Sequence, residues 1–269
     1  MAIHPTAVVN SKAELASDIE VGPYCVIDGN VRIAAGCRLY QGVYVTGWTQ
    51  IGERCVLHPG VIVGHAPQDT KYKGERSYCR IGHGAVLREY VTIHRGTVPE
   101  STTIVGENCF LLAGCHVGHN CVIGDNVTLI NNAQLAGYVR VGDRATLGGQ
   151  AAVHQFVRIG ELAMVAGLAR IPMDIVPFAL TDVEGRVAGP NSVGLRRSNM
   201  PREHLLDIRQ AFRILFQTGV SRKEAIARVA SSVASPPGRR LVAFLREDSK
   251  RGLAGRFRRK VSTSDAASS

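Results

Sequence analysis

The chain has 269 residues, of which 45% are hydrophobic, and a formal net charge of +10 at pH 7. This length suits one large domain with a smaller one, and the apolar fraction is sufficient for a buried core. An apolar run long enough to span a membrane is lacking, and the opening Met-Ala-Ile-His-Pro does not resemble a signal peptide. We therefore expect a cytoplasmic protein without stable membrane insertion.

The positive charge is unevenly distributed. Residues 1–177 carry 14 Lys+Arg and 14 Asp+Glu, whereas residues 178–269 carry 18 and 8. A solvated helical surface explains part of this excess, and an acidic partner would explain the remainder. Aromatic residues do not alternate with the basic ones and no nucleic-acid motif is present, so we expect no nucleic-acid partner.

A period of six residues begins at the N-terminus. Aliphatic residues recur in one phase at Ile3, Val9, Leu15, Val21, Ile27, Ile33, Leu39, Val45, Ile51, Leu57 and Val63. A hexapeptide period is typical of a parallel β-helix, in which each hexad forms one face of a triangular prism and three hexads complete a coil. The sequence therefore predicts a mainly β fold, a left-handed parallel β-helix over residues 1–177.

Two segments interrupt the period. Keeping the phase through residues 65–79 would bury Asp69 and Glu75 without partners, so this segment is predicted to leave the prism as a loop. Long loops in compact folds are often functional, and Asp69 and Lys71 suit a polar ligand. A shorter excursion is predicted over residues 96–103. His94, just before it, is interpreted as a structural corner residue.

The period is strongest from Val105 to Ile171, where a small or β-branched residue follows each aliphatic one by four positions. This slot points inward. Six of the seven cysteines occupy it: Cys25, Cys37, Cys55, Cys109, Cys115 and Cys121. We expect them to be small buried hydrophobes, because no CxxC pair is present.

Residues eighteen apart stack on neighbouring coils, about 4.8 Å apart. His119, Gly137 and Gln155 therefore form one column on the outer surface. An imidazole is a competent general base at neutral pH, and Gly137 leaves a backbone N–H accessible to an oxyanion. Because the column has no Ser or Cys nucleophile, it suits direct attack of a hydroxyl, deprotonated by His119, on an acyl thioester.

Metal binding is the alternative chemistry. The run Cys115-His116-x-x-His119-x-Cys121 superficially resembles a zinc cluster. The hexad phase instead points both thiols inward and both imidazoles outward, so we expect no metal at this run. A zinc site made of histidines alone, as in the β-helical carbonic anhydrases, would need a third histidine from another chain; the candidates are His58, His83 and His94.

The pattern changes after Ile171, where Pro172 and Pro177 are predicted to end the prism. A helical C-terminal domain is expected over residues 178–260. Its predicted helices are Pro201–Gln217, a second opened by a capping box at Ser221 and Glu224, and Pro236–Arg251, closed by Gly252. Residues 261–269 are rich in Ser and Ala and are predicted to be disordered.

Several runs together resemble one known family, the UDP-N-acetylglucosamine 3-O-acyltransferases, which catalyse the first step of lipid A biosynthesis. They are Gln68-Asp69-x-Lys71-Tyr72-x-Gly74-Glu75, Val91-Thr92-Ile93-His94-Arg95-Gly96-Thr97, His116-x-x-His119, Asn131-Asn132-Ala133, Ala152-Val153-His154-Gln155-Phe156 and Gly194-Leu195-x-Arg197. The resemblance extends from about Ile3 to Gly255.

The resemblance implies a homotrimer with active sites between the prisms, and no cofactor. It implies transfer of an (R)-3-hydroxyacyl chain from acyl carrier protein to the 3-hydroxyl of the UDP-sugar, with His119 as general base and the Gly137 N–H at the oxyanion. The substrate contacts it implies are Asp69 and Lys71 for the sugar, His116, His154 and Gln155 along the pocket, Asn191 and Arg197 for the nucleotide, and Gly167 for a long acyl chain. An acidic carrier protein would also account for the basic C-terminal third.

Four residues depart from the family pattern. Asn120 stands where an Asp is common, Tyr138 where a His is usual, Val193 in place of a Glu, and Ser198 in place of a second Arg. The acyl-transfer core therefore matches better than the nucleotide-binding fringe. Two alternatives remain: a related N-acyltransferase acting on an amino-sugar nucleotide, and a non-catalytic or zinc-binding β-helix.

Overall fold

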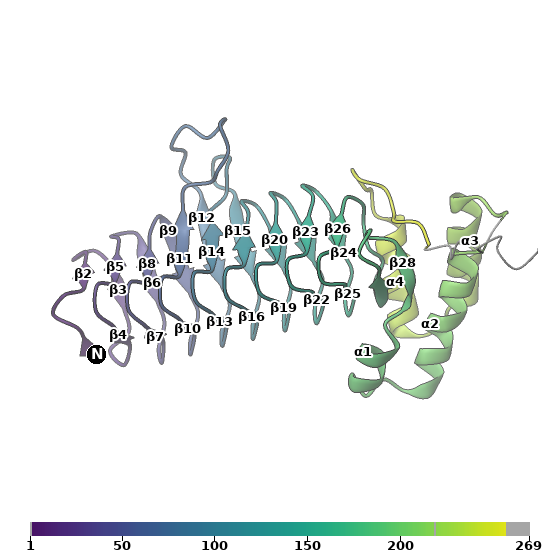
Figure 1. Ribbon diagram of the computed structural model, residues 1–269, viewed down its shortest axis with the longest axis horizontal. Coiled ribbons are helices and arrows are strands. Elements are labelled where there is room, and N and C mark those ends of the chain that lie inside the picture. The colour runs from purple at the N-terminus through teal and green to yellow at the C-terminus, as the bar shows by residue number, and fades with distance from the viewer. Residues whose placement is uncertain (1, 218, 257–269) are drawn as a thin grey trace, which may run out of the picture.

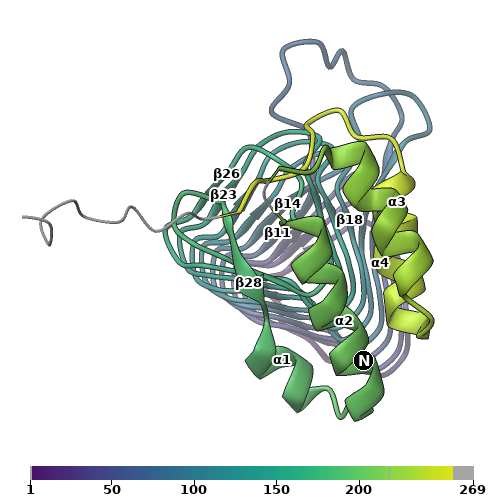
Figure 2. The same ribbon diagram turned by 90° about the vertical axis from the view of Figure 1, so that its right-hand side faces the viewer.

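The protein is a long triangular prism with a small helical domain at one end (Figures 1 and 2). The computed structural model describes residues 2–217 and 219–256. Short strands follow one another around three parallel sheets wound in the left-handed sense, so the predicted fold class is confirmed.

The strands stack in chain order along each sheet. The first sheet contains β1 (Ala2–Ile3), β4 (Glu20–Val21), β7 (Arg38–Leu39), β10 (Val56–Leu57), β13 (Val86–Leu87), β16 (Phe110–Leu111), β19 (Thr128–Leu129), β22 (Thr146–Leu147), β25 (Met164–Val165), β27 (Ala179–Thr181) and β28 (Val187–Pro190). The second contains β2 (Val8–Val9), β5 (Val26–Ile27), β8 (Tyr44–Val45), β11 (Ile62–His65), β14 (Thr92–His94), β17 (His116–Val117), β20 (Gln134–Leu135), β23 (Ala152–Val153) and β26 (Arg170–Ile171). The third contains β3 (Glu14–Leu15), β6 (Val31–Ile33), β9 (Trp48–Ile51), β12 (Tyr78–Ile81), β15 (Thr102–Val105), β18 (Val122–Ile123), β21 (Arg140–Val141) and β24 (Arg158–Ile159).

The register follows the six-residue period. His116 pairs with Gln134, and Gln134 pairs with Ala152, so residues eighteen apart do lie on neighbouring rungs. The aliphatic residue of each hexad fills the interior, where Leu111, Leu129 and Leu147 are fully buried. All seven cysteines are buried and free, as expected of small hydrophobes. Burial raises the pKa of the Cys79 and Cys121 thiols to about 12.

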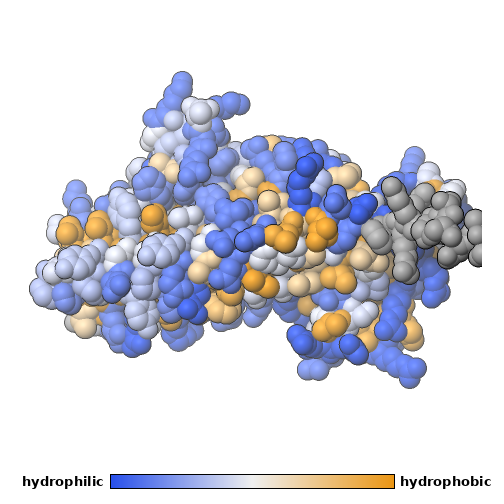
Figure 3. Space-filling view, in the orientation of Figure 1, coloured by the Kyte–Doolittle hydropathy of each residue, from blue (hydrophilic) through white to orange (hydrophobic). Residues whose placement is uncertain are grey.

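Two loops leave the prism, as predicted, but both are shorter than expected. His65 still belongs to β11, Tyr78 and Cys79 belong to β12, and Thr102 and Thr103 belong to β15. The strands are longer here because all four residues of β12 pair with β9 on one side and with β15 on the other. The loops project together from one edge (Figure 1), and Figure 3 shows this projection in hydrophilic colours.

The prism does not end at Pro177. β27 pairs with β25 on the first sheet, and β28 turns back antiparallel to β27 and closes that sheet. The helices α1 (Ser192–Arg197), α2 (Arg202–Leu215), α3 (Arg222–Ser232) and α4 (Pro236–Arg246) follow. The sequence reading missed this hairpin and α1, because short elements of Gly, Pro and Arg residues carry no periodic signal.

The longer helices lie near their predicted positions. The Ser221 hydroxyl accepts the Glu224 N–H at 3.2 Å, which confirms this N-cap. α4 ends at Arg246 and not at Arg251, because Glu247 turns toward Arg140 and Arg158 on the prism. The predicted disordered tail, residues 261–269, lies outside the described residues. Among residues 2–217 and 219–256, none of the helices has the length and apolarity to cross a membrane.

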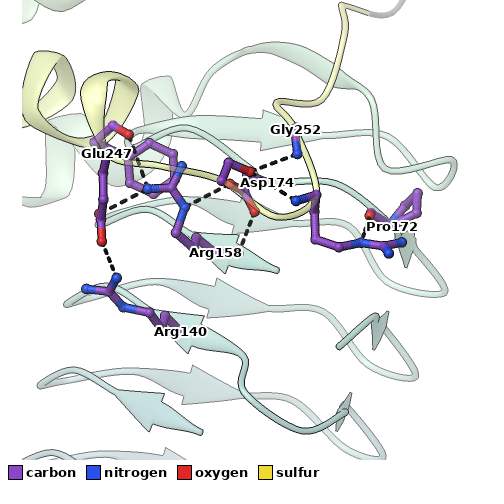
Figure 4. Close-up of polar contacts among 9 residues, drawn as sticks. Arg140, Arg158, Pro172, Asp174, Glu247 and Gly252 are labelled. Atoms are coloured by element: carbon purple, nitrogen blue, oxygen red, sulfur yellow. Dashed lines mark hydrogen bonds and ion pairs between the residues drawn. The ribbon is translucent and has the colours of Figure 1, made fainter. Parts of the chain in front are cut away.

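A buried ion pair joins the prism to the helical domain (Figure 4). Arg158 donates through its backbone N–H and its Nε to the Asp174 carboxylate, both at 2.8 Å, and Asp174 is completely buried. Arg158 Nη1 also contacts Glu247 at 3.0 Å, and its guanidinium lies 4.4 Å from the centre of the Phe244 ring. The same arginine therefore holds both the last rung and the end of α4.

We expect Asp174→Ala to destabilise the protein by about 3–5 kcal/mol, because it leaves a buried guanidinium and a buried backbone N–H without their main acceptor. Thermal and urea unfolding measure this effect. Glu14→Ala is the control, because the Glu14–Arg32 pair is exposed on both sides and should contribute nothing measurable. An Asp174→Ala protein that unfolds with the wild-type midpoint contradicts the prediction.

Candidate active site

A cavity of about 1020 Å³ runs along the outer face of the second sheet. It extends from the first projecting loop, across β17, β20 and β23, to β26 and the C-terminal segment. Seven of the ten predicted site residues line it: Asp69, Lys71, His116, His119, Gly137, His154 and Gln155. Segments separated by up to 183 positions in the sequence, from Gln68 to Arg251, therefore meet in one cavity.

The His119 imidazole lies directly over Gly137. A Cβ on residue 137 would stand 2.5 Å from both Cε1 and Nε2 of this ring, which is too close for any side chain. Glycine is therefore required here because of the imidazole and not because of the backbone conformation. The ring lies outside the prism interior, yet the residue is only 9% exposed because the projecting loops cover it.

The His119 imidazole is hydrogen-bonded through one of its two nitrogens. His119 Nδ1 lies 2.9 Å from Asn120 Oδ1, which also accepts the Thr97 backbone N–H at 3.0 Å. Because the Asn120 side-chain atom that accepts the Thr97 N–H must be the amide oxygen, the atom facing His119 Nδ1 is also this oxygen. An amide oxygen carries no hydrogen and can only accept a hydrogen bond from Nδ1. Nδ1 therefore carries the proton, which leaves the lone pair on Nε2, the nitrogen that faces Gly137 and the cavity.

Asn120 is held by more than its side chain. Its backbone N–H donates to the Thr103 hydroxyl at 2.7 Å, and its φ of 60° lies in the left-handed region that Asn tolerates well. Asn120, in place of the Asp that is common in the family, thus removes a negative charge behind His119 but keeps a hydrogen-bond acceptor that fixes the His119 tautomer.

The Gly137 N–H is available to a ligand. Gly137 is the second residue after Leu135, the aliphatic residue of its hexad. Among the described residues no carbonyl accepts a hydrogen bond from this N–H. Pro5, Pro23 and Pro59 occupy the same position on other rungs, which is possible because the prism needs no N–H there. The rung geometry therefore leaves a free donor beside His119 Nε2.

The first projecting loop brings Asp69 to the imidazole. Asp69 Oδ2 is 3.9 Å from His119 Nε2 and accepts a hydrogen bond from the Thr97 hydroxyl at 3.4 Å. Its Oδ1 accepts the backbone N–H of Lys71 at 2.9 Å, and this hydrogen bond is the main reason that the Asp69 pKa is lowered. The carboxylate is therefore ionised at neutral pH beside the lone pair of His119.

Arg95 holds the loop in place. Its guanidinium donates to the Tyr72 hydroxyl and to the Gly64 carbonyl, both at 2.8 Å. The sequence reading did not select Arg95, because a single arginine near a loop is usually solvated.

His94 also lines the cavity, although the sequence reading assigned it a structural role. Its ring centre lies 4.8 Å from that of His116, and His116 Nδ1 is 2.8 Å from the Thr92 hydroxyl. Burial, together with the neighbouring His116, lowers the His94 pKa to about 4. The second loop lengthens the sequence separation of residues on neighbouring rungs from eighteen to twenty-four here. The expectation that residues eighteen apart stack on each other therefore could not connect His94 with His116.

This depressed pKa predicts an acid-sensitive fold. The unfolded chain binds a proton at His94 near pH 6.5 and the folded chain only near pH 4, so the free energy of unfolding rises with pH across this window. Acidification from pH 7 to 4 should cost about 3 kcal/mol through His94. Urea unfolding of His94→Asn should show a correspondingly flatter pH dependence, whereas the exposed His83→Asn should follow the wild type. Equal slopes for His94→Asn and wild type would refute this origin.

Three predicted site residues do not reach the cavity in this chain. Gly167 lies on another edge of the prism, between β25 and β26, beside Leu168, which is 69% exposed. Asn191 accepts the Gly194 N–H at 3.0 Å as the cap of α1 and donates to the Leu162 carbonyl at 2.9 Å. Arg197 ends α1 and does not line the cavity.

Tyr138 forms an aromatic ladder beside the column. Its ring meets the His119 ring edge-on with centres 5.3 Å apart, and it stacks on Phe156 at 5.0 Å. Residues 138 and 156 both adopt left-handed backbone conformations at the corner, so their side chains stand one above the other. Tyr138, which stands where the family usually has a His, therefore packs its ring against the His119 imidazole and adds no second base.

A zinc cluster formed by the Cys/His run of residues 115–121 does not match this geometry. Cys115 and Cys121 are fully buried inside the prism, whereas His116 and His119 line the external cavity, so the four cannot converge on one ion. Within the described ranges, residues 2–217 and 219–256, there is no group of three or more His, Cys, Asp or Glu placed to hold a metal.

Two family models match the chain. The model described as UDP-N-acetylglucosamine O-acyltransferase, domain 2, matches residues 174–254, and the bacterial transferase hexapeptide model matches residues 102–137. These matches cover the helical domain with its connection to the prism, and the rungs that contain His119 and Gly137.

Curated relatives match nearly the whole chain. Proteins named acyl-(acyl-carrier-protein)–UDP-N-acetylglucosamine O-acyltransferase are 41% identical in Thermodesulfovibrio yellowstonii, over 93% of this chain and 98% of the relative, and 42% identical in Brucella ovis, over 93% and 91%. Among solved structures, LpxA from Acinetobacter baumannii superposes with a TM-score of 0.90 at 33% identity, covering 94% of this chain and 100% of that one. UDP-N-acetylglucosamine acyltransferase from Campylobacter jejuni gives 0.88 at 34%, covering 95% and 100%.

Proposed function

The chain belongs to the UDP-N-acetylglucosamine O-acyltransferase family, and from this membership we propose that its histidine cavity transfers an (R)-3-hydroxyacyl chain from acyl carrier protein to the 3-hydroxyl of UDP-N-acetylglucosamine. In this family that transfer is the first step of lipid A biosynthesis. The observation that carries the assignment to this cavity is the juxtaposition of a fixed imidazole lone pair with a free backbone N–H.

The residues suit a direct transfer. His119 Nε2 takes the proton of the sugar hydroxyl, and the oxygen attacks the thioester carbonyl carbon, forming the new C–O bond. The Gly137 N–H donates to the oxyanion of the tetrahedral intermediate. The C–S bond then breaks, the carbonyl re-forms, and the proton on His119 passes to the departing thiolate.

Asp69 supplies the charge that Asn120 lacks. Its carboxylate, 3.9 Å from Nε2, stabilises the imidazolium that forms during the transfer. With Lys71 it also offers hydrogen bonds to the sugar hydroxyls from the loop side. His116, His154 and Gln155 also line the cavity and orient the substrates.

We assign the assembly as a homotrimer whose sites are shared between neighbouring prisms. Gly167, Asn191 and Arg197 lie outside the cavity of their own chain, so only a second copy can bring them to it. In this arrangement Gly167 of the neighbour leaves room for a long acyl chain, and Asn191 and Arg197 contact the nucleotide. Sedimentation equilibrium of the full chain measures the oligomeric state.

The C-terminal third supplies the docking surface for the acidic carrier protein. Residues 178–269 contain 18 Lys+Arg and 8 Asp+Glu, whereas residues 1–177 are balanced. Association should therefore weaken as the salt concentration rises, because exposed charges attract over about 8–10 Å at ordinary ionic strength.

Mass spectrometry of the product tests the function. The protein is incubated with (R)-3-hydroxyacyl carrier proteins of several chain lengths and either UDP-N-acetylglucosamine or its 3-amino analogue. We expect an ester on the hydroxyl sugar. An amide formed faster on the amino sugar would instead assign an N-acyltransferase, an alternative favoured by Val193 and Ser198 at the nucleotide fringe. Product from neither acceptor would refute acyl transfer.

A further inference from the structure

The chain returns to the prism after α4. Residues 249–256, here called the C-terminal strap, cross the last rung (Figure 2, in yellow). Gly252 accepts the Asp174 N–H at 2.8 Å, Ala254 donates to the Asp174 carbonyl at 2.9 Å, and Gly255 accepts the Val187 N–H at 2.8 Å. The buried Ala254 packs below these bonds, so the strap is a fixed part of the prism end.

The strap delivers cations to the end of the active-site cavity. Arg251 donates from Nε to the Pro172 carbonyl at 3.0 Å, and it lines the cavity together with Arg170 of β26. Lys250 lies beside them on the outer surface, with Nζ 4.3 Å from the centre of the Phe156 ring. The Nη atoms of Arg251 and the whole guanidinium of Arg170 can therefore turn to a ligand.

These cations have no carboxylate partner within the described part of the chain, residues 2–217 and 219–256. None of the three forms an ion pair there. Of the two carboxylates in the neighbouring turn, Asp182 is already bound by Arg186 at 2.9 Å, and the exposed Glu184 forms no ion pair with the three cations. By contrast, the two arginines on the next face, Arg140 and Arg158, both contact Glu247. A cluster of unneutralised cations at the mouth of a substrate cavity suits a phosphate.

The distance from His119 decides whether this phosphate belongs to the acceptor nucleotide or to the donor arm. Gly118, next to His119, and Pro172, to which Arg251 of the strap is bonded, are 54 residues or three rungs apart. The strap therefore lies about 14 Å along the prism axis from the rung of His119. The diphosphate of the acceptor is separated from the reacting 3-hydroxyl by the sugar ring alone, roughly 5–6 Å. The phosphopantetheine arm of the donor has about thirteen bonds between sulfur and phosphorus, which span roughly 15 Å when extended.

We infer that Arg170 and Arg251, flanked by Lys250, bind the phosphate of the phosphopantetheine arm of the donor. This inference rests on the proposed transfer from acyl carrier protein. It places the thioester at His119, the arm along the second sheet, and the carrier protein against the basic helical domain, from which the strap returns to the prism. The phosphate site therefore sets the reach of the arm.

The test compares two small competitors that differ only in this phosphate, S-acyl-4′-phosphopantetheine and S-acyl-pantetheine, against transfer from acyl carrier protein. The wild type should be inhibited about tenfold or more strongly by the phosphorylated compound, as expected of charge-assisted hydrogen bonds. In the double variant Arg170→Gln/Arg251→Gln this difference should vanish, and the KM for acyl carrier protein should rise while the KM for UDP-N-acetylglucosamine stays unchanged. Arg32→Gln, which removes an exposed cation of β6 that is paired with Glu14 at the opposite end of the prism, is the matched control.

Each contrary outcome is distinct. Equal or absent inhibition by the two compounds in the wild type, or an unchanged ratio in the double variant, overturns the phosphate site. A rise in the KM for the nucleotide sugar alone would assign the cations to the acceptor. Arg170→Gln by itself separates binding from strap stability, because among the described residues the only hydrogen bond of Arg170 outside the β-ladder joins its backbone N–H to the Val183 carbonyl and not to the strap. A wild type that transfers no acyl group from carrier protein refutes the proposed function, and the inference with it.

Discussion

His119→Ala is expected to lower kcat/KM for acyl transfer by about 10²–10⁴-fold, the usual contribution of a positioned general base. The lone pair of this imidazole is fixed by its surroundings: Asn120 accepts from Nδ1, so Nε2 faces Gly137 and its free N–H. Steady-state transfer from acyl carrier protein to UDP-N-acetylglucosamine measures the effect.

The fold should survive this substitution, since the prism interior contains no part of the ring. Circular dichroism and thermal unfolding check that. His83→Ala, on an exposed corner near Glu53, is the matched histidine control and should retain wild-type rates. Transfer by His119→Ala within a few-fold of wild type would remove His119 from the mechanism and leave His154 or His116 as the base.

Gly137→Ala should lower kcat by about 10²–10³-fold, comparable with the loss of one oxyanion donor. The added methyl would stand 2.5 Å from His119 Cε1 and Nε2, so the imidazole must move away from the position that Asn120 gives it. Neither residue loses a functional group in this variant. Any loss of rate therefore reports the geometry that the two residues share.

The control for Gly137→Ala is Gly189→Ala on β28, where a Cβ would meet no atom within 4 Å. Its rate and stability should equal those of the wild type. Stability of Gly137→Ala itself should change little, because residue 137 does not need a left-handed backbone. If kcat of Gly137→Ala equals that of wild type, the ring and the N–H do not act together.

The hexad period predicted the prism because it is a local property. Each side chain of a strand alternates in or out, and each corner recurs after six residues, so position in the sequence gives position on the surface. That rule correctly placed the cysteines inside and His119 over Gly137. Helix starts were equally local: Ser221 caps α3 through its own neighbour Glu224.

Where the six-residue period stops, the sequence alone did not predict which residues lie side by side or where a helix ends. His94 was not connected with His116, because the second loop adds a hexad between their rungs. α4 was extended too far, because its end depends on Glu247 reaching Arg140 and Arg158, more than 85 residues earlier.

The sequence by itself determined the prism, its inward and outward faces, and the column of His119, Gly137 and Gln155, since a repeat converts spacing directly into geometry. Only the tertiary structure decided what surrounds that column. Asp69 reaches the imidazole, Thr97 fixes the Asn120 amide, and Arg251 comes back from the end of the chain. These contacts join segments that obey no period, so their positions follow from packing and hydrogen bonds between distant parts of the chain, which no local pattern encodes.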